Sequence, residues 1–212
     1  MTTNHSAVRA VLTMVVIATF CAILIAATHH WTADQIAANE QARLEQSLVP
    51  ALAGLDFDGS VSGSLMVLQP PHDLPGDDAA EIYRVYADGE PAAALIAVTA
   101  RGGFSGPIRI LVGVHYDGTV TGVRILEHQE TPGLGDKIES KRSRWVFQFD
   151  ERSLADPTME SWAIRADGGD FDQITGASVT PRAVIKAIRD TLIYFNVARD
   201  ELFAAPVAEA NE

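Results

Sequence analysis

Cysteine is almost absent from this 212-residue sequence: the single thiol, Cys21, lies inside an apolar run. One thiol forms neither an internal disulfide, nor a zinc site, nor a thiolate-bound iron–sulfur centre. Any redox chemistry would therefore need a cofactor held by other side chains. Basic residues are also scarce, since 16 Lys and Arg stand against 28 Asp and Glu and the formal net charge is −12. This balance argues against nucleic-acid binding, which needs clustered cations to neutralise phosphates.

Long apolar runs are scarce too, and the one present spans residues 10–28 without a charge. At about 1.5 Å per residue, it approaches the ~30 Å hydrocarbon thickness of a bilayer. A cleaved signal peptide is the alternative, because Ala26 and Ala27 resemble a cleavage site, but its apolar core would be shorter. We therefore expect residues 1–31 to be an N-terminal segment that contains an uncleaved transmembrane anchor.

The charges that flank this run predict its orientation. Arg9 and the terminal amine precede it, whereas an acidic stretch follows from Asp34. The positive-inside rule then places the N-terminus in the cytoplasm and the main domain in the periplasm of a bacterium. The sequence thus predicts a single-pass protein of the bacterial inner membrane.

The remainder divides into a helix, one domain and a short tail. Thr32 and Gln35 form a capping-box pair, so residues 32–55 are expected to contain a juxtamembrane helix that ends near Pro50. Residues 56–205 are expected to form the periplasmic domain, and residues 206–212 a flexible tail. This length suits one ordinary globular domain with an appendage.

Turn signals and alternation predict antiparallel strands within that domain. Residues 82–87 and 93–100 flank Asp88-Gly89, and residues 108–116 and 120–126 flank Asp117-Gly118. Aspartate–glycine pairs between apolar runs are strong hairpin signals. A further strand is expected at residues 65–68. Apolar residues alternate with others over 108–116, which is typical of a sheet with one buried face.

Helical elements are expected mainly after the strands. The sequence predicts a short helix over residues 136–145, a short strand over 162–165 and a long amphipathic helix from Pro181 to about Phe203. This order indicates an α+β fold, in which an antiparallel sheet with flanking helices follows a single N-terminal transmembrane helix.

Two segments carry the residues most suited to chemistry, 127–135 and 172–181. Thr180 followed by Pro181 is typical of a helix start, with Thr180 as the cap. The N–H groups of a helix N-terminus favour a phosphate. Ser178 lies two residues upstream, beside the small Gly176 and Ala177, and is open to a bulky group. Its alternative role is merely to help cap the helix, and the residues alone leave this open.

Other chemistries fit the sequence poorly. The segment around Ser178 lacks the second glycine of a Gly-x-Ser-x-Gly elbow, so no serine-hydrolase triad is expected. The glycine-rich residues 102–106 lack the Gly-Lys-Ser/Thr ending of a phosphate loop and are interpreted as a plain loop. His128 is assigned no role, and neither a catalytic residue nor a metal ligand is predicted.

The two segments resemble the motifs of the FMN-binding domain family. Residues 172–178 are similar to its flavinylation motif Asp-x-x-(Ser/Thr)-Gly-Ala-Thr, and residues 130–135 match its Glu-Thr-Pro-Gly-Leu-Gly loop. In that family a flavin transferase joins FMN to the last hydroxyl through a phosphoester. The resemblance implies covalent FMN on Ser178, where the family normally has threonine, with Thr180 as the alternative acceptor. The implied pocket residues are Thr131, Leu134, Gly135, Thr175, Gly176, Ala177, Val179 and Thr180.

The whole chain is similar to the G subunits of Rnf-type electron-transport complexes. This implies an electron-transfer subunit of a membrane complex that couples a ferredoxin–NAD reaction to ion movement, without complete activity of its own. The implied partners are the other membrane subunits, including a second flavinylated one. One alternative is the C subunit of the sodium-pumping NADH–quinone reductase, which is typically a longer chain. The other is a non-redox, membrane-tethered periplasmic binding or scaffold domain.

Overall fold

A computed structural model describes residues 12, 14, 15, 17–19, 48–52, 54–59 and 61–204. The chain separates into two compact units, with the division between Arg43 and Leu44. The described residues of the first unit are helical and exposed. Within the described ranges, no helix is both long and apolar enough to cross a membrane. Most of the expected anchor and juxtamembrane helix, and the whole expected tail, lie outside those ranges.

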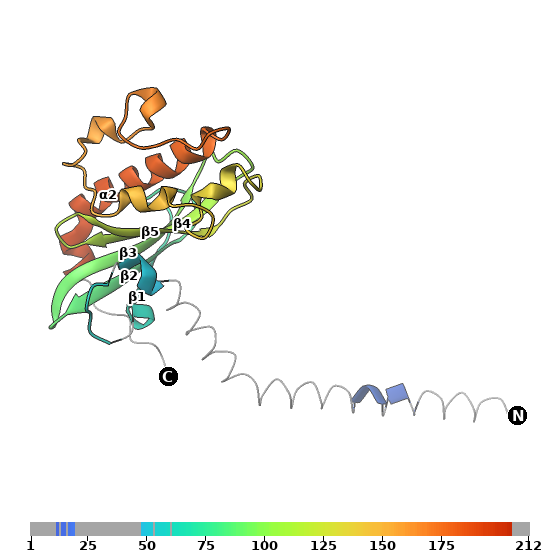
Figure 1. Cartoon of the computed structure of the whole chain (residues 1–212). Helices are drawn as coiled ribbons and strands as arrows, with labels where there is room; N and C mark the ends of the chain where they lie inside the picture. The colour runs from blue at the N-terminus through green and yellow to red at the C-terminus, as the bar shows by residue number, and fades with distance from the viewer. Residues whose placement is uncertain are drawn as a thin grey trace, which may run out of the picture. The chain divides into compact units, whose positions relative to one another are not determined.

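The second unit contains one antiparallel sheet of five described strands, which neighbour one another in chain order. The predicted strand and the two predicted hairpins are confirmed, and the antiparallel α+β class with them (Figure 1). The strands are β1 Leu65–Leu68, β2 Ala80–Ala87, β3 Glu90–Ala100, β4 Ile108–His115 and β5 Val120–Glu127.

The two aspartate–glycine pairs form the turns of these hairpins. Asp88 and Gly89 have φ angles of +52° and +78°. This pair of positive angles belongs to the tight I′ turn, whose twist suits adjoining strands. At the second turn only Gly118 takes a positive φ, +94°, and the Asp117 carboxylate accepts a bond of 2.8 Å from the Thr119 N–H.

Both faces of the sheet are covered, which corrects the expectation of one buried face. On one face, Ile96, Ile110 and Val112 belong to a core with the long helix α2, Val179–Ala204. On the other, Leu95 and Leu111 pack with the 3-10 turns η1 and η2. Figure 1 shows α2 and η1 on opposite sides of the sheet. The alternation of residues 108–116 did not predict this second core, because the polar Arg109 and His115 lie at the two ends of β4, on either side of an apolar centre.

The other elements of the described domain are short 3-10 turns. They are η1 Val49–Leu52, η2 Val61–Ser64, η3 Gly135–Ile138, η4 Trp145–Phe149, η5 Met159–Ser161 and η6 Arg165–Asp167. The predicted helix over 136–145 is wrong, because η3 ends at Ile138 and η4 begins only at Trp145. The predicted strand over 162–165 is also wrong: Ile164 makes one isolated bridge with Phe171 and then enters η6.

An aromatic cluster explains both errors. The Phe149 ring contacts those of Trp145, Trp162 and Phe171, and the last two contact each other, with centroids 4.8 to 6.3 Å apart. The two indole N–H groups donate to backbone carbonyls of other loops, at Asp172 and Ser153. These apolar residues are buried in a shared cluster of turns, so their spacing does not follow the period of a single helix or strand.

Candidate functional site

The segment that precedes α2 is held in one shape by its neighbours. The Asp172 carbonyl accepts a 2.6 Å hydrogen bond from the Trp145 indole. The backbone N–H of Asp172 donates a 2.7 Å hydrogen bond to the Gln148 amide oxygen. Ala177 N–H then bonds to the Ile174 carbonyl and closes a tight turn. The chain therefore enters α2 from a fixed direction.

Both the backbone conformation and the packing of this turn favour glycine at position 176. The φ of Gly176 is +83°, a conformation that side chains with a Cβ rarely adopt. A Cβ at this position would also lie 3.2 Å from the Leu134 side chain. The turn thus brings the 172–178 segment against the 130–135 loop, and two motifs that are distant in sequence meet in space.

Ser178, rather than Thr180, occupies the capping position of α2. The Arg182 N–H bonds to the Ser178 carbonyl at 3.4 Å, which makes Ser178 the residue just before the first helical turn. The expectation that Thr180 is the cap is therefore wrong, because Thr180 already lies inside the helix. Ser178 is partly exposed. Its hydroxyl lies at the positive end of the helix dipole, a favourable seat for an anion.

The Arg182 guanidinium contacts the Ser178 hydroxyl. Its Nη1 donates to Ser178 Oγ at 3.2 Å, while Nε and Nη2 donate to the two Asp167 carboxylate oxygens at 2.6 and 2.8 Å. These hydrogen bonds hold the pKa of the Asp167 carboxyl below its ordinary value and raise the pKa of Arg182. A charged pair therefore stands beside the hydroxyl at neutral pH.

Thr180 is bound to a buried carboxylate. It is 0% exposed, and its hydroxyl donates 2.5 Å to Glu130 Oε2. The other oxygen of Glu130 accepts a 3.0 Å bond from the Ser105 N–H, in the glycine-rich loop. Glu130 is only 5% exposed. One carboxylate thus ties the 102–106 loop, the 130–135 loop and the first turn of α2 together.

A cavity of about 600 Å³ lies where these segments meet. This volume is within the usual range for small-molecule sites, about 300–1,000 Å³. The structure brings every residue of the predicted site to its wall: Thr131, Leu134, Gly135, Thr175, Gly176, Ala177, Ser178, Val179 and Thr180.

The cavity wall also includes residues outside the predicted site. These are Phe104, Glu130, Ala166, Gln173, Ile174 and Arg182. Arg182 had a usable signal, because it follows Ser178 by four residues on a predicted helix. Phe104 had none, since its loop is distant in sequence and is joined to the site by the Ser105–Glu130 hydrogen bond. Phe104, Leu134 and Val179 are 72%, 42% and 41% exposed, so the cavity has an apolar rim.

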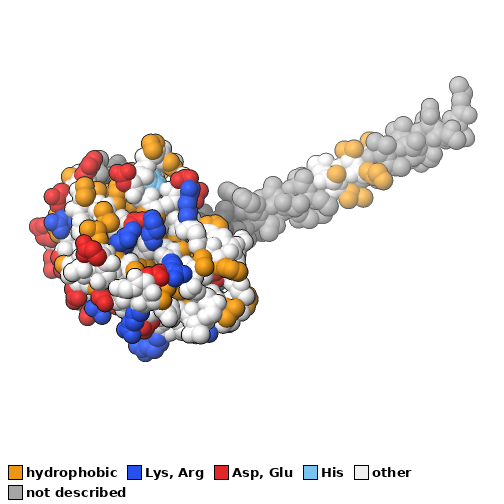
Figure 2. Space-filling model, turned by 90° about the horizontal axis from the view of Figure 1, so that it is seen from above, with side chains coloured by type: hydrophobic (Ala, Val, Ile, Leu, Met, Phe, Trp, Pro, Cys, Tyr) orange, Lys and Arg blue, Asp and Glu red, His pale blue; other side chains and the backbone are white. Residues whose placement is uncertain are grey.

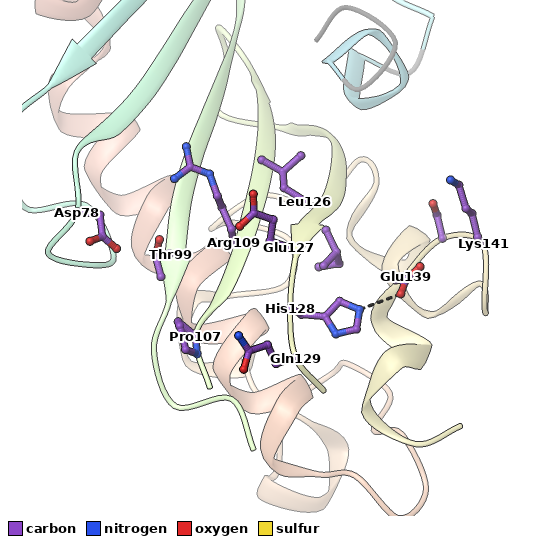
Figure 3. Close-up of a pocket in the computed structure, with 12 residues that line it drawn as sticks. Asp78, Thr99, Pro107, Arg109, Leu126, Glu127, His128, Gln129, Glu139 and Lys141 are labelled. Atoms are coloured by element: carbon purple, nitrogen blue, oxygen red, sulfur yellow. Dashed lines mark hydrogen bonds and ion pairs between the residues drawn. The ribbon is translucent and has the colours of Figure 1, made fainter. Parts of the chain in front are cut away.

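A second cavity of about 750 Å³ lies beside His128. Figure 3 shows Glu127, Glu139 and Asp78 around it, with the His128 ring directed at Glu139. His128 Nδ1 accepts from the Glu130 N–H, so its Nε2 carries the hydrogen that bonds Glu139 Oε1 at 2.8 Å. Arg109 and Lys141 also line this cavity, so its charges are mixed, and none of the predicted site residues lies on its wall.

Charge on the surface is mixed rather than concentrated. On the face drawn in Figure 2, acidic side chains gather toward one edge, and basic ones are scattered among apolar and uncharged ones. Within the described part of the chain, no group of three His, Cys, Asp or Glu side chains is arranged to hold a metal ion.

Residues 103–193 match the family described as FMN-binding domain, and residues 1–49 match the family described as RnfG N-terminal region. The chain is similar to proteins named as the G subunit of an ion-translocating oxidoreductase complex. It is 40% identical to the one from Vibrio atlanticus over 87% of this chain and 88% of that protein. For Vibrio parahaemolyticus the identity is 39%, over 92% of each chain. For Shewanella oneidensis it is 36%, over 96% of each.

A solved structure shares the fold. The crystal structure of Shewanella oneidensis NqrC matches with a TM-score of 0.54 at 19% identity, covering 79% of this chain and 100% of that one. At this identity the likeness establishes a common architecture and nothing about ligands.

Proposed function

Because the chain belongs to the family of G subunits of ion-translocating oxidoreductase complexes and contains an FMN-binding domain, we propose that it relays electrons through FMN joined to Ser178. FMN, when bound, accepts and donates electrons through its ring system, and the protein positions it. The observation that carries the proposal is the partly exposed Ser178 hydroxyl, which lies at the start of α2 and on the wall of the cavity.

The cavity suits the chemistry of FMN. An anionic phosphate fits the N-terminal end of α2, where free N–H groups and the helix dipole favour negative charge. A flat apolar ring fits the rim formed by Phe104, Leu134 and Val179. Gly135 allows a close approach of the loops, since a Cβ there would meet Glu130 and Thr180.

Attachment requires an activated flavin. A free serine hydroxyl is a weak nucleophile, so the reaction needs a flavin transferase and a flavin donor with a phosphoanhydride. The bond from Ser178 Oγ to phosphorus forms as the anhydride P–O bond breaks. The hydroxyl proton passes to a base of the transferase, and the electron pair leaves with the departing phosphate. A covalent tether keeps the flavin at a high effective concentration even in a compartment where free FMN would be diluted.

We also propose a location in the cell and a set of partners for this chain. Residues 10–28 would anchor the chain in the bacterial inner membrane, with the domain in the periplasm. The partners would be the other membrane subunits of a ferredoxin–NAD-coupled Rnf-type complex, including a second flavinylated subunit. One uncharged apolar helix offers no path for an ion, so translocation would belong to those partners.

Intact mass spectrometry tests the attachment site. We expect the full chain, co-produced with a flavin transferase, to gain the mass of one FMN ester. Ser178→Ala should lose this increment, because alanine has no nucleophile. Ser178→Thr should keep it, since threonine presents the same hydroxyl.

Two outcomes would contradict the proposal. A wild-type chain without any increment would refute covalent flavin. An increment that persists in a folded Ser178→Ala protein would move the attachment to another residue.

A further inference from the structure

Arg182 contacts both the Ser178 hydroxyl and the Asp167 carboxylate, and Asp167 reaches this position only through the fold. We propose that Arg182 is a catalytic residue of flavin attachment, and that Asp167 is the positioning residue that aims it. Arg182 stabilises the Ser178 oxygen during ester formation and afterwards binds the phosphate. This inference rests on the attachment site proposed above.

The geometry of the guanidinium carries the argument. An arginine side chain presents its N–H groups in a rigid planar fork, so two fixed contacts determine the direction of the third nitrogen. Nε and Nη2 of Arg182 are fixed by the two oxygens of Asp167, at 2.6 and 2.8 Å. The remaining nitrogen, Nη1, is then directed at Ser178 Oγ, 3.2 Å away.

Asp167 is itself held in place from both sides. It ends η6, and its N–H bonds to the Ile164 carbonyl. The same turn contacts the 172–178 segment. Arg165 forms a 3.1 Å ion pair with Asp172, and the Ala166 N–H donates a 3.2 Å hydrogen bond to the Gln173 side chain. The carboxylate that aims Arg182 is therefore fixed to the segment that presents Ser178.

The direction of the hydrogen bond matches what the reaction requires. Nη1 donates, so it uses a lone pair of Oγ and leaves the hydroxyl hydrogen to be removed by the base of the transferase. As Oγ attacks phosphorus and the anhydride bond breaks, negative charge is carried on the oxygens around phosphorus. A fixed cation beside the reacting oxygen stabilises that charge more in the transition state than in the starting hydroxyl.

Arg182 and the N-terminus of α2 are also suited to bind the phosphate of the product. An arginine and a helix N-terminus are both favourable partners of a phosphate, and here they converge on one oxygen. A lysine one turn further along the helix offers no such contact: Lys186 bonds to Asp190 Oδ2 at 2.5 Å. Lys186 therefore provides a matched control, because it is also a cation on α2 in an ion pair with an aspartate.

The experiment follows flavin transfer in time with the full chain, a purified flavin transferase and a flavin dinucleotide, read by intact mass. We expect Arg182→Gln to lower kcat for modification of the chain roughly tenfold. This is less than the fall in kcat when a buried oxyanion donor is removed, because the Arg182 side chain is 46% exposed. KM for the chain should change little. Arg182→Lys should recover part of kcat, since it keeps the charge without the fork. Lys186→Gln should match wild type.

Each outcome decides one question. If the wild type gains no mass, the proposed function fails and the role of Arg182 with it. If the wild type is modified and a folded Arg182→Gln variant reaches the same kcat, only the role of Arg182 is overturned. An equal loss in Lys186→Gln would also overturn it, because the effect would then be a general one of charge.

Should Arg182→Gln fail to fold, Asp167→Asn carries the test. It leaves Arg182 in place but weakens the contacts that orient it, so kcat should fall, by less than the roughly tenfold loss expected without Arg182. A kcat equal to that of wild type in Asp167→Asn would then refute the positioning role.

Discussion

At the scale of single residues, burial separates two hydroxyls that the sequence places side by side. Ser178 precedes the first turn of α2, whereas Thr180 lies inside the helix. Ser178 is accordingly partly exposed at the cavity, whereas Thr180 is fully buried against Glu130. This contact favours Ser178 over Thr180 as the proposed flavin acceptor.

Thr180→Val tests the structural role of Thr180. The substitution keeps the shape but removes the hydroxyl that donates to the buried Glu130, so we expect a loss of about 1–3 kcal/mol in the free energy of unfolding. Urea unfolding of the purified protein measures this. Thr191→Val is the control: Thr191 is equally buried but donates only to the Ala187 carbonyl on its own helix, so a smaller loss is expected.

The same variant separates the two acceptors. Thr180→Val should still gain the flavin mass, because Ser178 is unchanged. Loss of the increment in a folded Thr180→Val protein would instead favour Thr180 as the attachment site.

At the scale of elements, glycines allow segments to approach one another where side chains would not fit. A Cβ at Gly103 would overlap the Gly106 carbonyl and meet Glu130, so the loop that presents Phe104 depends on this glycine. On the other face of the sheet, Gly113 of β4 pairs with Gly122 of β5 beneath η1. The Thr121 hydroxyl donates 2.6 Å to the Ala51 carbonyl there and fixes η1 to the sheet.

Gly113→Ala tests this docking. The added methyl group would overlap the Ala51 carbonyl oxygen and the Thr121 hydroxyl, so η1 must shift. We expect a destabilisation of about 1–3 kcal/mol, typical of overpacking in a core. Chemical denaturation gives the free energy, and a faster cleavage by protease near η1 would locate the change.

Gly63→Ala provides the comparison, because a Cβ at Gly63 meets nothing within 4 Å. It should stay within about 0.5 kcal/mol of wild type, as expected for surface changes. Equal losses in the two variants would refute the steric account of Gly113.

At the scale of the whole molecule, the domain has two cores on one sheet, and the candidate site lies at only one end of α2. Arg84 stabilises the opposite end, since its buried guanidinium donates to the Leu202 carbonyl in the last turn. A cation at a helix C-terminus complements the dipole that favours a phosphate at the N-terminus. The long helix therefore connects an end held by Arg84 with the end that lines the candidate site.

The predicted topology is open to a direct test with cysteine labelling. Glu160 is exposed in η5, and the native thiol Cys21 falls in the apolar run. We expect Glu160→Cys to react in intact cells with a maleimide that enters the periplasm but does not cross the inner membrane. Thr3→Cys should react only after lysis, because the positive-inside rule places it in the cytoplasm. The reverse pattern of labelling would overturn the predicted orientation.

Local patterns were sufficient for much of this protein. The two hairpins follow from aspartate–glycine turns between apolar runs, and α2 follows from its apolar period, because both signals depend on residues that are close in sequence. The family followed from two short motifs. The apolar run at residues 10–28 predicts an anchor on length alone.

What only the tertiary structure decided depends on contacts between distant segments. The 3-10 turns replaced a predicted helix and strand because Trp145 and Phe171 are buried in one aromatic cluster. Thr180 proved to be buried rather than a cap because Glu130, fifty positions away, accepts its hydrogen bond. The loop of Phe104 reaches the site through the Ser105–Glu130 hydrogen bond, and Asp167 reaches Arg182 across the fold. Burial and hydrogen bonding of this kind act between residues that no local period relates.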